Sequence, residues 1–313
     1  MQENDYLSGV ERLVPAGDLT LWAEGFGDPR DPAILLVMGA GAQGVQWNDG
    51  LIARLAAAGH HVIRYDHRDT GRSSTVDFAT SPYTVADLAS DALAVLDAFA
   101  VERAHLVGVS LGGLLVQHLA RTHPHRVRTQ TVISSTPLGA DTGAAVERAL
   151  AGLEPLPGML PPPSLAVLSA LAASLPPAGA SAADYLAARR PLWRVLHGGV
   201  LPFPEEEYGR LEARVHARAR DLSAAVNHSL AGAAGFDAMG GAGGGAGDRP
   251  PALVIHGSED PMFPPEHGRA VADALPGATL VMVDGMGHTL PACLDGLLAE
   301  AVLDHIGRRV NAG

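Results

Sequence analysis

The sequence lacks lysine: all 22 of its basic residues are arginine, against 34 acidic residues, and the formal net charge is −12. An acidic surface repels phosphate backbones, so we expect no binding to nucleic acid. The single cysteine, Cys293, allows neither an intrachain disulfide nor a cysteine zinc cluster, and we expect it to be a small buried residue in a C-terminal helix. The longest mainly apolar runs, residues 34–42 and 106–116, fall well short of the roughly 20 residues that span a bilayer.

Other features that mark special classes of protein are also missing. The first residues show no basic start followed by an apolar stretch, so we expect no secretory signal. Glycine (37) and proline (23) together stay below the share that is typical of disordered chains. A chain of 313 residues buries a full core without added cross-links. We therefore expect a globular cytoplasmic protein without membrane partners, and leave open whether it is a monomer or a homodimer.

Short apolar runs alternate with helical patterns before residue 137 and after residue 250. The continuous run at residues 33–38 is typical of a strand buried on both faces. The patterns predict strands at residues 19–23, 33–38, 61–65, 105–109, 128–133, 253–256 and 279–283, and helices at 47–58, 84–99, 112–122, 265–275 and 292–308. Such alternation implies parallel crossovers, so we predict an α/β fold with a mostly parallel central sheet flanked by helices.

Between residues 137 and 235 this alternation stops. Only helical patterns separated by proline and glycine remain, at residues 142–153, 164–175, 182–196, 204–220 and 221–230. We interpret this segment as a helical cap domain (137–235) inserted between late strands of a core domain (1–136 and 236–313), lying over the carboxyl edge of the sheet. The glycine-rich residues 240–247 predict a mobile loop that leads back into the sheet.

One motif carries a clear chemical prediction. Residues 105–113 read His-Leu-Val-Gly-Val-Ser-Leu-Gly-Gly, which is an apolar strand followed by Gly-x-Ser-x-Gly and a helix. The two glycines suit a tight turn that has no room for Cβ atoms, holds Ser110 in a strained conformation and presents its hydroxyl at the sheet edge. The alternative is a structural turn without chemistry, but the strand and helix on either side favour a nucleophile.

A serine hydroxyl needs a neighbouring base. Asp260 lies just past the strand predicted at 253–256, and His288 follows the strand predicted at 279–283, so both loops emerge at the same edge as Ser110. Acid and then histidine after the serine is the chain order of this type of fold. We therefore predict a triad of Ser110, His288 and Asp260, with Glu259 and Asp284 as weaker candidates for the acid.

A serine nucleophile of this kind also needs an oxyanion hole, usually made of two N–H donors. The N–H of Leu111, directly after the serine, supplies one at the start of a helix, and the N–H of Ala40, in the glycine-rich loop after residues 33–38, should supply the second. The alternative for this loop is a simple tight turn. The predicted machinery requires no metal and no organic cofactor.

The sequence resembles the α/β-hydrolase superfamily and, more narrowly, the anthracycline (aclacinomycin) methylesterases of polyketide biosynthesis. The matching stretches are residues 12–18, 36–39, 62–73, 106–112, 193–194 (Trp-Arg), 202–203 (Pro-Phe) and 285–288 (Gly-Met-Gly-His). Matched position by position, the family implies Ser110, Asp260 and His288 as the triad, with Ala40 and Leu111 as oxyanion donors. Residues 65–73 are shared by many α/β hydrolases, and we interpret His67 there as structural.

Two departures from the family concern the substrate. Where the family has Gly-Asn after Met-Gly, this chain has Ala40 and Gly41, and the segment from residue 240 onward is of low complexity. The resemblance implies a serine carboxylic-ester hydrolase that works through an acyl-enzyme and removes a methyl ester from an aromatic polyketide in secondary metabolism. Candidate pocket residues, for which a place in the core is the alternative, are Gly39, Trp193, Phe203, Tyr208, Met262 and Phe263.

Several rival functions remain at this stage. A general carboxylesterase or a cofactor-free haloperoxidase or perhydrolase would share the triad. Haloalkane dehalogenases and epoxide hydrolases need an aspartate at the nucleophile position, so Ser110 argues against both. A ligand-binding pseudo-hydrolase that uses the pocket only for recognition is disfavoured by the complete triad.

Overall fold

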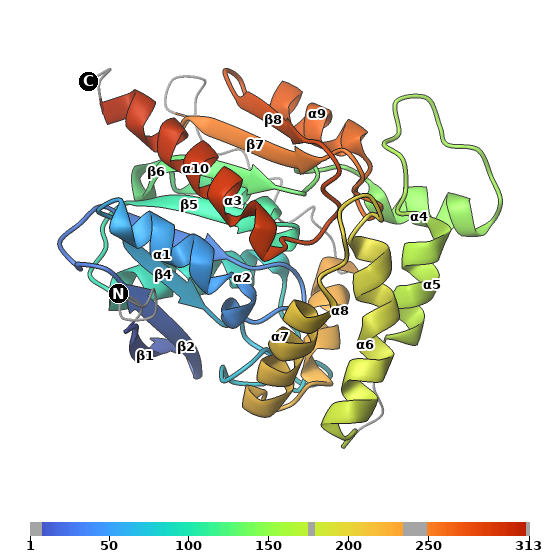
Figure 1. Ribbon diagram of the computed structural model, residues 1–313, viewed down its shortest axis with the longest axis horizontal. Coiled ribbons are helices and arrows are strands. Elements are labelled where there is room, and N and C mark those ends of the chain that lie inside the picture. Colours follow the sequence, from blue (N-terminus) through green and yellow to red (C-terminus); the bar gives the residue numbers. More distant parts are fainter. Residues whose placement is uncertain (1–7, 175–178, 234–248, 311–313) are drawn as a thin grey trace.

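The computed structural model describes residues 8–174, 179–233 and 249–310. An eight-stranded sheet in the order β1-β2-β4-β3-β5-β6-β7-β8 forms its centre (Figure 1). Strands β3 to β8 run parallel, whereas β2 pairs antiparallel with both β1 and β4. The strands are β1 (Val10–Ala16), β2 (Leu19–Phe26), β3 (Ala33–Val37), β4 (His61–Tyr65), β5 (Ala104–Val109), β6 (Val127–Ile133), β7 (Ala252–Gly257) and β8 (Thr279–Val283).

Helices cover both faces of the sheet. Successive side chains of a strand point to opposite faces, so the apolar runs supply two cores. In β3, Leu35 packs with α2 (Val85–Ala98) and α3 (Leu111–Thr122), while Ile34 and Leu36 pack with α1 (Asp49–Ala57) and α10 (Asp295–Val310). Helix α9 (Pro265–Ala274) joins α2 and α3 on their face. The predicted α/β fold is confirmed.

Two details differ from the sequence-based expectations. Strand β1 was not predicted; it is an edge strand whose Val10 and Leu13 are exposed. Cys293 was expected to be buried, but it is exposed in a short 3-10 turn before α10. The buried stripe there consists of Leu294, Leu298, Val302 and Ile306, which are spaced four residues apart, so the neighbouring Cys293 falls off it.

The chain between β6 and β7 forms helices joined by loops in its described part, without a strand. It contains α4 (Thr142–Leu150), α5 (Leu165–Ala173), α6 (Ala182–Leu196), α7 (Glu205–Arg218) and α8 (Asn227–Ala233), here called the insertion helices. They stand together to the right of the sheet, at the carboxyl ends of its parallel strands (Figure 1). The division into core and cap domains remains a prediction, and residues 240–247 lie outside the described part.

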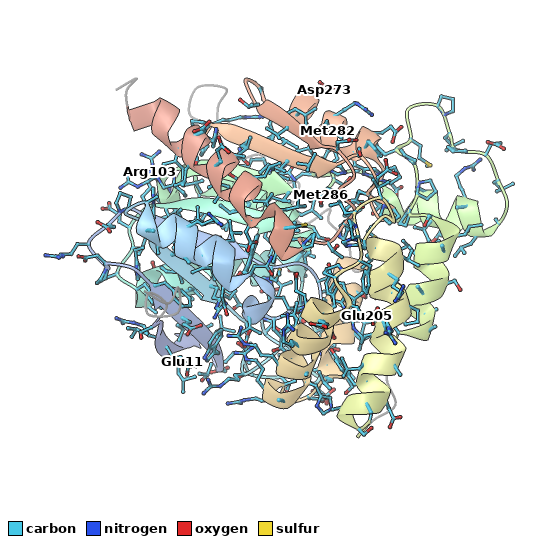
Figure 2. All side chains as sticks on the ribbon, viewed as in Figure 1. Glu11, Arg103, Glu205, Asp273, Met282 and Met286 are labelled. Carbon is cyan, nitrogen blue, oxygen red and sulfur yellow. The ribbon has the colours of Figure 1, made fainter. Side chains whose placement is uncertain are left out.

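Arginine ion pairs connect two of the insertion helices. Arg190 and Arg194 of α6 both pair with Glu205 at the start of α7, where Figure 2 places Glu205 between the two helices.

Along the described part of the chain, no helix is both long enough and apolar enough to cross a membrane.

Candidate active site

Ser110 occupies the sharp turn between β5 and α3. Its backbone has φ +56° and ψ −119°, a left-handed conformation that is rare and strained for a residue other than glycine. A Cβ on Gly108 would stand 2.2 Å from the carbonyl oxygen of Gly112, and one on Gly112 would stand 2.1 Å from that of Val37. The prediction that this turn is strained and needs both glycines is confirmed.

Asp260 and His288 follow β7 and β8, and their side chains meet. The Nδ1 atom of His288 lies 2.9 Å from Oδ2 and 3.1 Å from Oδ1 of Asp260. Oδ1 of Asp260 also accepts from the N–H groups of Met262 and Phe263, both at 2.9 Å. In the neutral imidazole, Nδ1–H donates to the carboxylate, and Nε2 is then the ring nitrogen that can accept a proton.

The environment of Asp260 favours its charged form. The carboxylate is buried, which alone raises its pKa, but the adjacent His288 imidazole and the N–H donors more than offset burial. The pKa of Asp260 is therefore below its ordinary value. Neither Glu259 nor Asp284 has a hydrogen bond to His288 among the described residues.

The insertion helices fix the loop that carries His288. The backbone N–H of His288 donates to the carbonyl of Leu196, at the end of α6, over 2.6 Å. A Cβ on Gly287 would stand 2.4 Å from the same oxygen, so the two segments touch through their backbones. His288 and Ser110 line one cavity, but within the described chain no hydrogen bond joins their side chains. In free enzymes such hydrogen bonds are often long and shorten only with substrate bound.

The loop after β3 lies against the serine. A Cβ on Gly39 would stand 3.3 Å from Cβ of Ser110. In the described part of the chain, the N–H groups of Ala40 and Leu111 donate to no protein acceptor. Leu111 is the first residue of α3, where N–H groups lack partners within the helix and the helix dipole favours negative charge. Ala40 lines the cavity, and the role of both N–H groups as oxyanion donors remains a prediction.

A cavity of about 500 Å³ opens above Ser110. Its walls come from the loop after β3, the insertion helices α5 to α8 and the loops carrying Met262 and His288, and they are mostly apolar. The predicted pocket residues that line it are Gly39, Trp193, Tyr208 and Met262. A volume between about 300 and 1,000 Å³ with few polar groups is typical of sites for small molecules.

The other two predicted pocket residues are not among the described lining residues. The ring of Phe203 stacks on that of Tyr208, with centroids 5.0 Å apart, and so supports the wall from behind. The ring of Phe263 lies edge-on to His288 at 5.6 Å. Contact of Phe203 and Phe263 with a substrate remains a prediction.

An ion pair in the cavity wall was missed by sequence reasoning. Nε of Arg189, which lines the cavity, lies 3.6 Å from Oε2 of Glu212, whose side chain is 2% exposed. Burial raises the pKa of Glu212, although Arg189 opposes this effect. The two residues belong to α6 and α7, and no motif marks them in the sequence.

His67 is buried beside the loop after β3. Its Nε2–H donates to the carbonyl of Met38 over 3.0 Å, and it does not line the cavity. Burial and the neighbouring His228 lower the pKa of His67 to about 3, so the ring is neutral. His228 of α8, which sequence reasoning missed, reaches the same loop from the other side: its Nδ1 accepts from the N–H of Gly41. Within the described chain, no group of three or more His, Cys, Asp or Glu residues is arranged to hold a metal ion.

Comparison with known proteins extends these observations. Residues 32–291 match a family model described as the alpha/beta hydrolase fold. Two methylesterases are similar over almost their whole length. Rhodomycin D methylesterase DauP of Streptomyces sp. (strain C5) is 41% identical over 298 residues, covering 94% of this chain and 97% of DauP. Rhodomycin D methylesterase DnrP of Streptomyces peucetius is 40% identical over 296 residues, with the same coverage.

The fold is also found among solved structures. A hydrolase from Pseudomonas aeruginosa PA01 superposes with a TM-score of 0.64 at 27% identity. The match covers 96% of this chain and all of that one.

Proposed function

The chain belongs to the α/β-hydrolase family and is a carboxylic ester hydrolase, and from that premise we propose that Ser110, His288 and Asp260 are its catalytic triad. The contact of 2.9 Å between His288 and Asp260 carries this proposal, because it joins two loops 28 residues apart at the edge where Ser110 stands. The strained turn at Ser110 and the cavity shared by Ser110 and His288 support it.

In this mechanism the hydroxyl of Ser110 attacks the ester carbonyl while Nε2 of His288 takes its proton. Asp260 holds the imidazole in the tautomer that has Nε2 free and stabilises the imidazolium. The N–H groups of Ala40 and Leu111 donate to the oxyanion of the tetrahedral intermediate. His288 then protonates the departing alcohol, and water attacks the acyl-enzyme through the same steps, releasing the carboxylic acid.

For the substrate we propose a methyl ester on a polycyclic aromatic polyketide of the rhodomycin type. The names of the two methylesterase relatives motivate this choice. The mostly apolar cavity of about 500 Å³, with Trp193 and Tyr208 in its wall, suits a fused ring system. We place the reaction in the cytoplasm, with a small molecule as the partner.

The test is incubation of the purified protein with rhodomycin D, followed by mass spectrometry for the loss of a methyl group and the appearance of a free acid. Ser110→Ala should abolish both this reaction and the hydrolysis of p-nitrophenyl butyrate, while the circular dichroism spectrum stays unchanged. Retention of more than a few per cent of either activity by Ser110→Ala would contradict the triad. Rapid p-nitrophenyl butyrate turnover without reaction of rhodomycin D would contradict only the substrate.

A further inference from the structure

The loop after β3 has little support from the sheet. Strand β3 ends at Val37, and the next backbone hydrogen bond within the loop runs from the N–H of Ala42 to the carbonyl of Gly39, at 3.3 Å. Ala40 lies inside this turn, and Gly41 has φ +68°. The direction of the Ala40 N–H therefore depends on what holds the residues on either side of it.

Two buried histidines hold those flanking residues. His67 donates through Nε2–H to the carbonyl of Met38 at 3.0 Å, on one side of Ala40. His228 accepts the N–H of Gly41 at Nδ1 over 2.9 Å, on the other side. The rings of His67 and His228 meet edge to face, with centroids 5.6 Å apart and planes at 87°. Together they brace the loop from both ends.

The contacts of His228 also define its protonation. Nε2 lies 2.9 Å from the carbonyl oxygen of Arg68, which can only accept, so Nε2 carries the proton. Nδ1 is then the acceptor that the N–H of Gly41 requires. Both ring nitrogens are used, and the residue is 2% exposed. A bond this well defined fixes the orientation of Gly41.

We propose that His228 is a positioning residue for the oxyanion hole: by accepting the N–H of Gly41, it turns the N–H of Ala40 toward the developing oxyanion. This inference rests on the proposed function, because it assigns no chemistry of its own to His228. It places a support of the oxyanion hole on α8, one of the insertion helices, 187 residues along the chain from Gly41.

The two ring nitrogens can be tested separately. His228→Asn places an amide oxygen near the position of Nδ1 and keeps an acceptor for Gly41. His228→Gln reaches the position of Nε2 and keeps only the contact to Arg68, whereas His228→Leu keeps neither. With p-nitrophenyl butyrate we expect kcat to fall by about 10- to 100-fold in the Leu and Gln variants, less than the loss of a whole oxyanion donor. We expect KM to change less than about threefold, because the oxyanion forms only in the transition state.

The Asn variant should restore kcat to within a few-fold of the parent. A trifluoromethyl ketone, which forms a tetrahedral adduct with the active serine, provides a second readout. Its Ki should rise across the variants in proportion to the fall in kcat/KM, since the adduct carries the same oxyanion.

Asn227→Ala is the matched control. Asn227 is also buried on α8 and donates to Oδ2 of Asp69 and the carbonyl of Val76. Among the described residues, none of its side-chain hydrogen bonds reaches the loop after β3. We expect its thermal stability to fall while its kcat stays near the parental value. Equal kcat losses in Asn227→Ala and His228→Leu would overturn the proposal, as would a Gln variant as active as the Asn variant, or a rise in KM alone. Ser110→Ala distinguishes a failure of this inference from a failure of the proposed triad. If Ser110→Ala is inactive, the triad is upheld whatever the His228 variants do.

Discussion

The edge of the sheet around Ser110 and the insertion helices are held in place by different kinds of contact. At the sheet edge, backbone touches backbone, and the approach of Gly112 to the carbonyl of Val37 leaves no space for a methyl group. Among the insertion helices, a Cβ on Gly209 of α7 would meet nothing within 4 Å. Leu150 of α4 and Leu165 of α5 are exposed. The glycines that shape the turn at Ser110 are thus closed to larger residues, whereas the surface of the insertion helices has positions with room for a larger side chain.

The two regions are joined by buried polar contacts as well as by the apolar packing of Trp22 against Tyr185 and Val215. Arg218 of α7 pairs with the buried Asp66 at 2.8 Å, and its Nη1 also donates to Gln43 in the loop after β3. A charge as deeply buried as that of Asp66 is costly to leave unpaired. The ion pair of Arg218 with Asp66 therefore helps to keep α7 in register with the sheet edge.

The most damaging small change should lie at the sheet edge. In Gly112→Ala, the added methyl group would collide with a backbone oxygen that cannot move without displacing β3. We expect the free energy of unfolding to fall by about 1–3 kcal/mol, as for other overpacked sites. Because Ser110 stands two residues away, kcat should also fall at least about tenfold. Urea denaturation and steady-state kinetics measure the two effects, and parental values for both would refute a rigid sheet edge.

In the insertion helices, a change should act on substrate choice instead. Trp193 lines the cavity and stacks on Tyr208 with centroids 5.3 Å apart. In Trp193→Leu we expect KM for rhodomycin D to rise about tenfold, which corresponds to about 1.4 kcal/mol of binding. The value of kcat/KM for p-nitrophenyl acetate, a much smaller ester, serves as the control and should change less than about threefold. A similar loss for both esters would show that Trp193 supports the fold and does not select the substrate.

The sequence located the ends of several strands and the residues that follow them, while the catalytic roles of those residues stay a proposal. Ser110 directly follows β5, and Asp260 and His288 stand three and five residues past the ends of β7 and β8. Parallel strands bring such positions to one edge. Sequence reasoning missed β1, whose exposed Val10 and Leu13 do not follow the expected alternation.

The same reasoning could not find His228 or Glu212. His228 accepts from the backbone N–H of Gly41, and Glu212 pairs with Arg189 of another helix. No residue pattern between residues 137 and 235 indicates these contacts. The prediction of a helix at 221–230 located α8 only approximately, since a 3-10 turn (Ala224–Val226) precedes it. Local pattern therefore predicts elements and strand-end residues, but not the contacts between the insertion helices and the sheet edge.

The buried His67 makes the sheet edge sensitive to acid. Its pKa is lowered to about 3, chiefly by burial, from an ordinary value near 6.5. The folded state therefore binds fewer protons than the unfolded state between these values, and stability falls as the pH drops below about 6.5. One such group contributes a slope of at most about 1.4 kcal/mol per pH unit.

In His67→Gln, the amide can still donate to the carbonyl of Met38. This variant should lose the contribution of His67 to the pH dependence of the free energy of unfolding. Urea denaturation at several pH values between 4.5 and 7 measures it for the parent and the variant. His228 and other buried histidines titrate in both proteins, so only the difference between the slopes of unfolding free energy against pH is informative. Identical slopes in the parent and the variant would show that His67 is not neutral in the folded state.

The smallest effect is expected for Gly209→Ala. It should raise the free energy of unfolding, whereas the same exchange in Gly112→Ala should lower it. Gly209 lies inside α7 with open space around its Cα, and it does not line the cavity. Alanine there restricts the unfolded chain and favours the helix, so Gly209→Ala should raise the free energy of unfolding by about 0.5–1 kcal/mol. Urea denaturation detects this gain, and kcat and KM for p-nitrophenyl butyrate should stay at parental values. If Gly209→Ala instead lost stability as Gly112→Ala should, α7 would be packed as tightly as the sheet edge, and the contrast between the two regions would not hold.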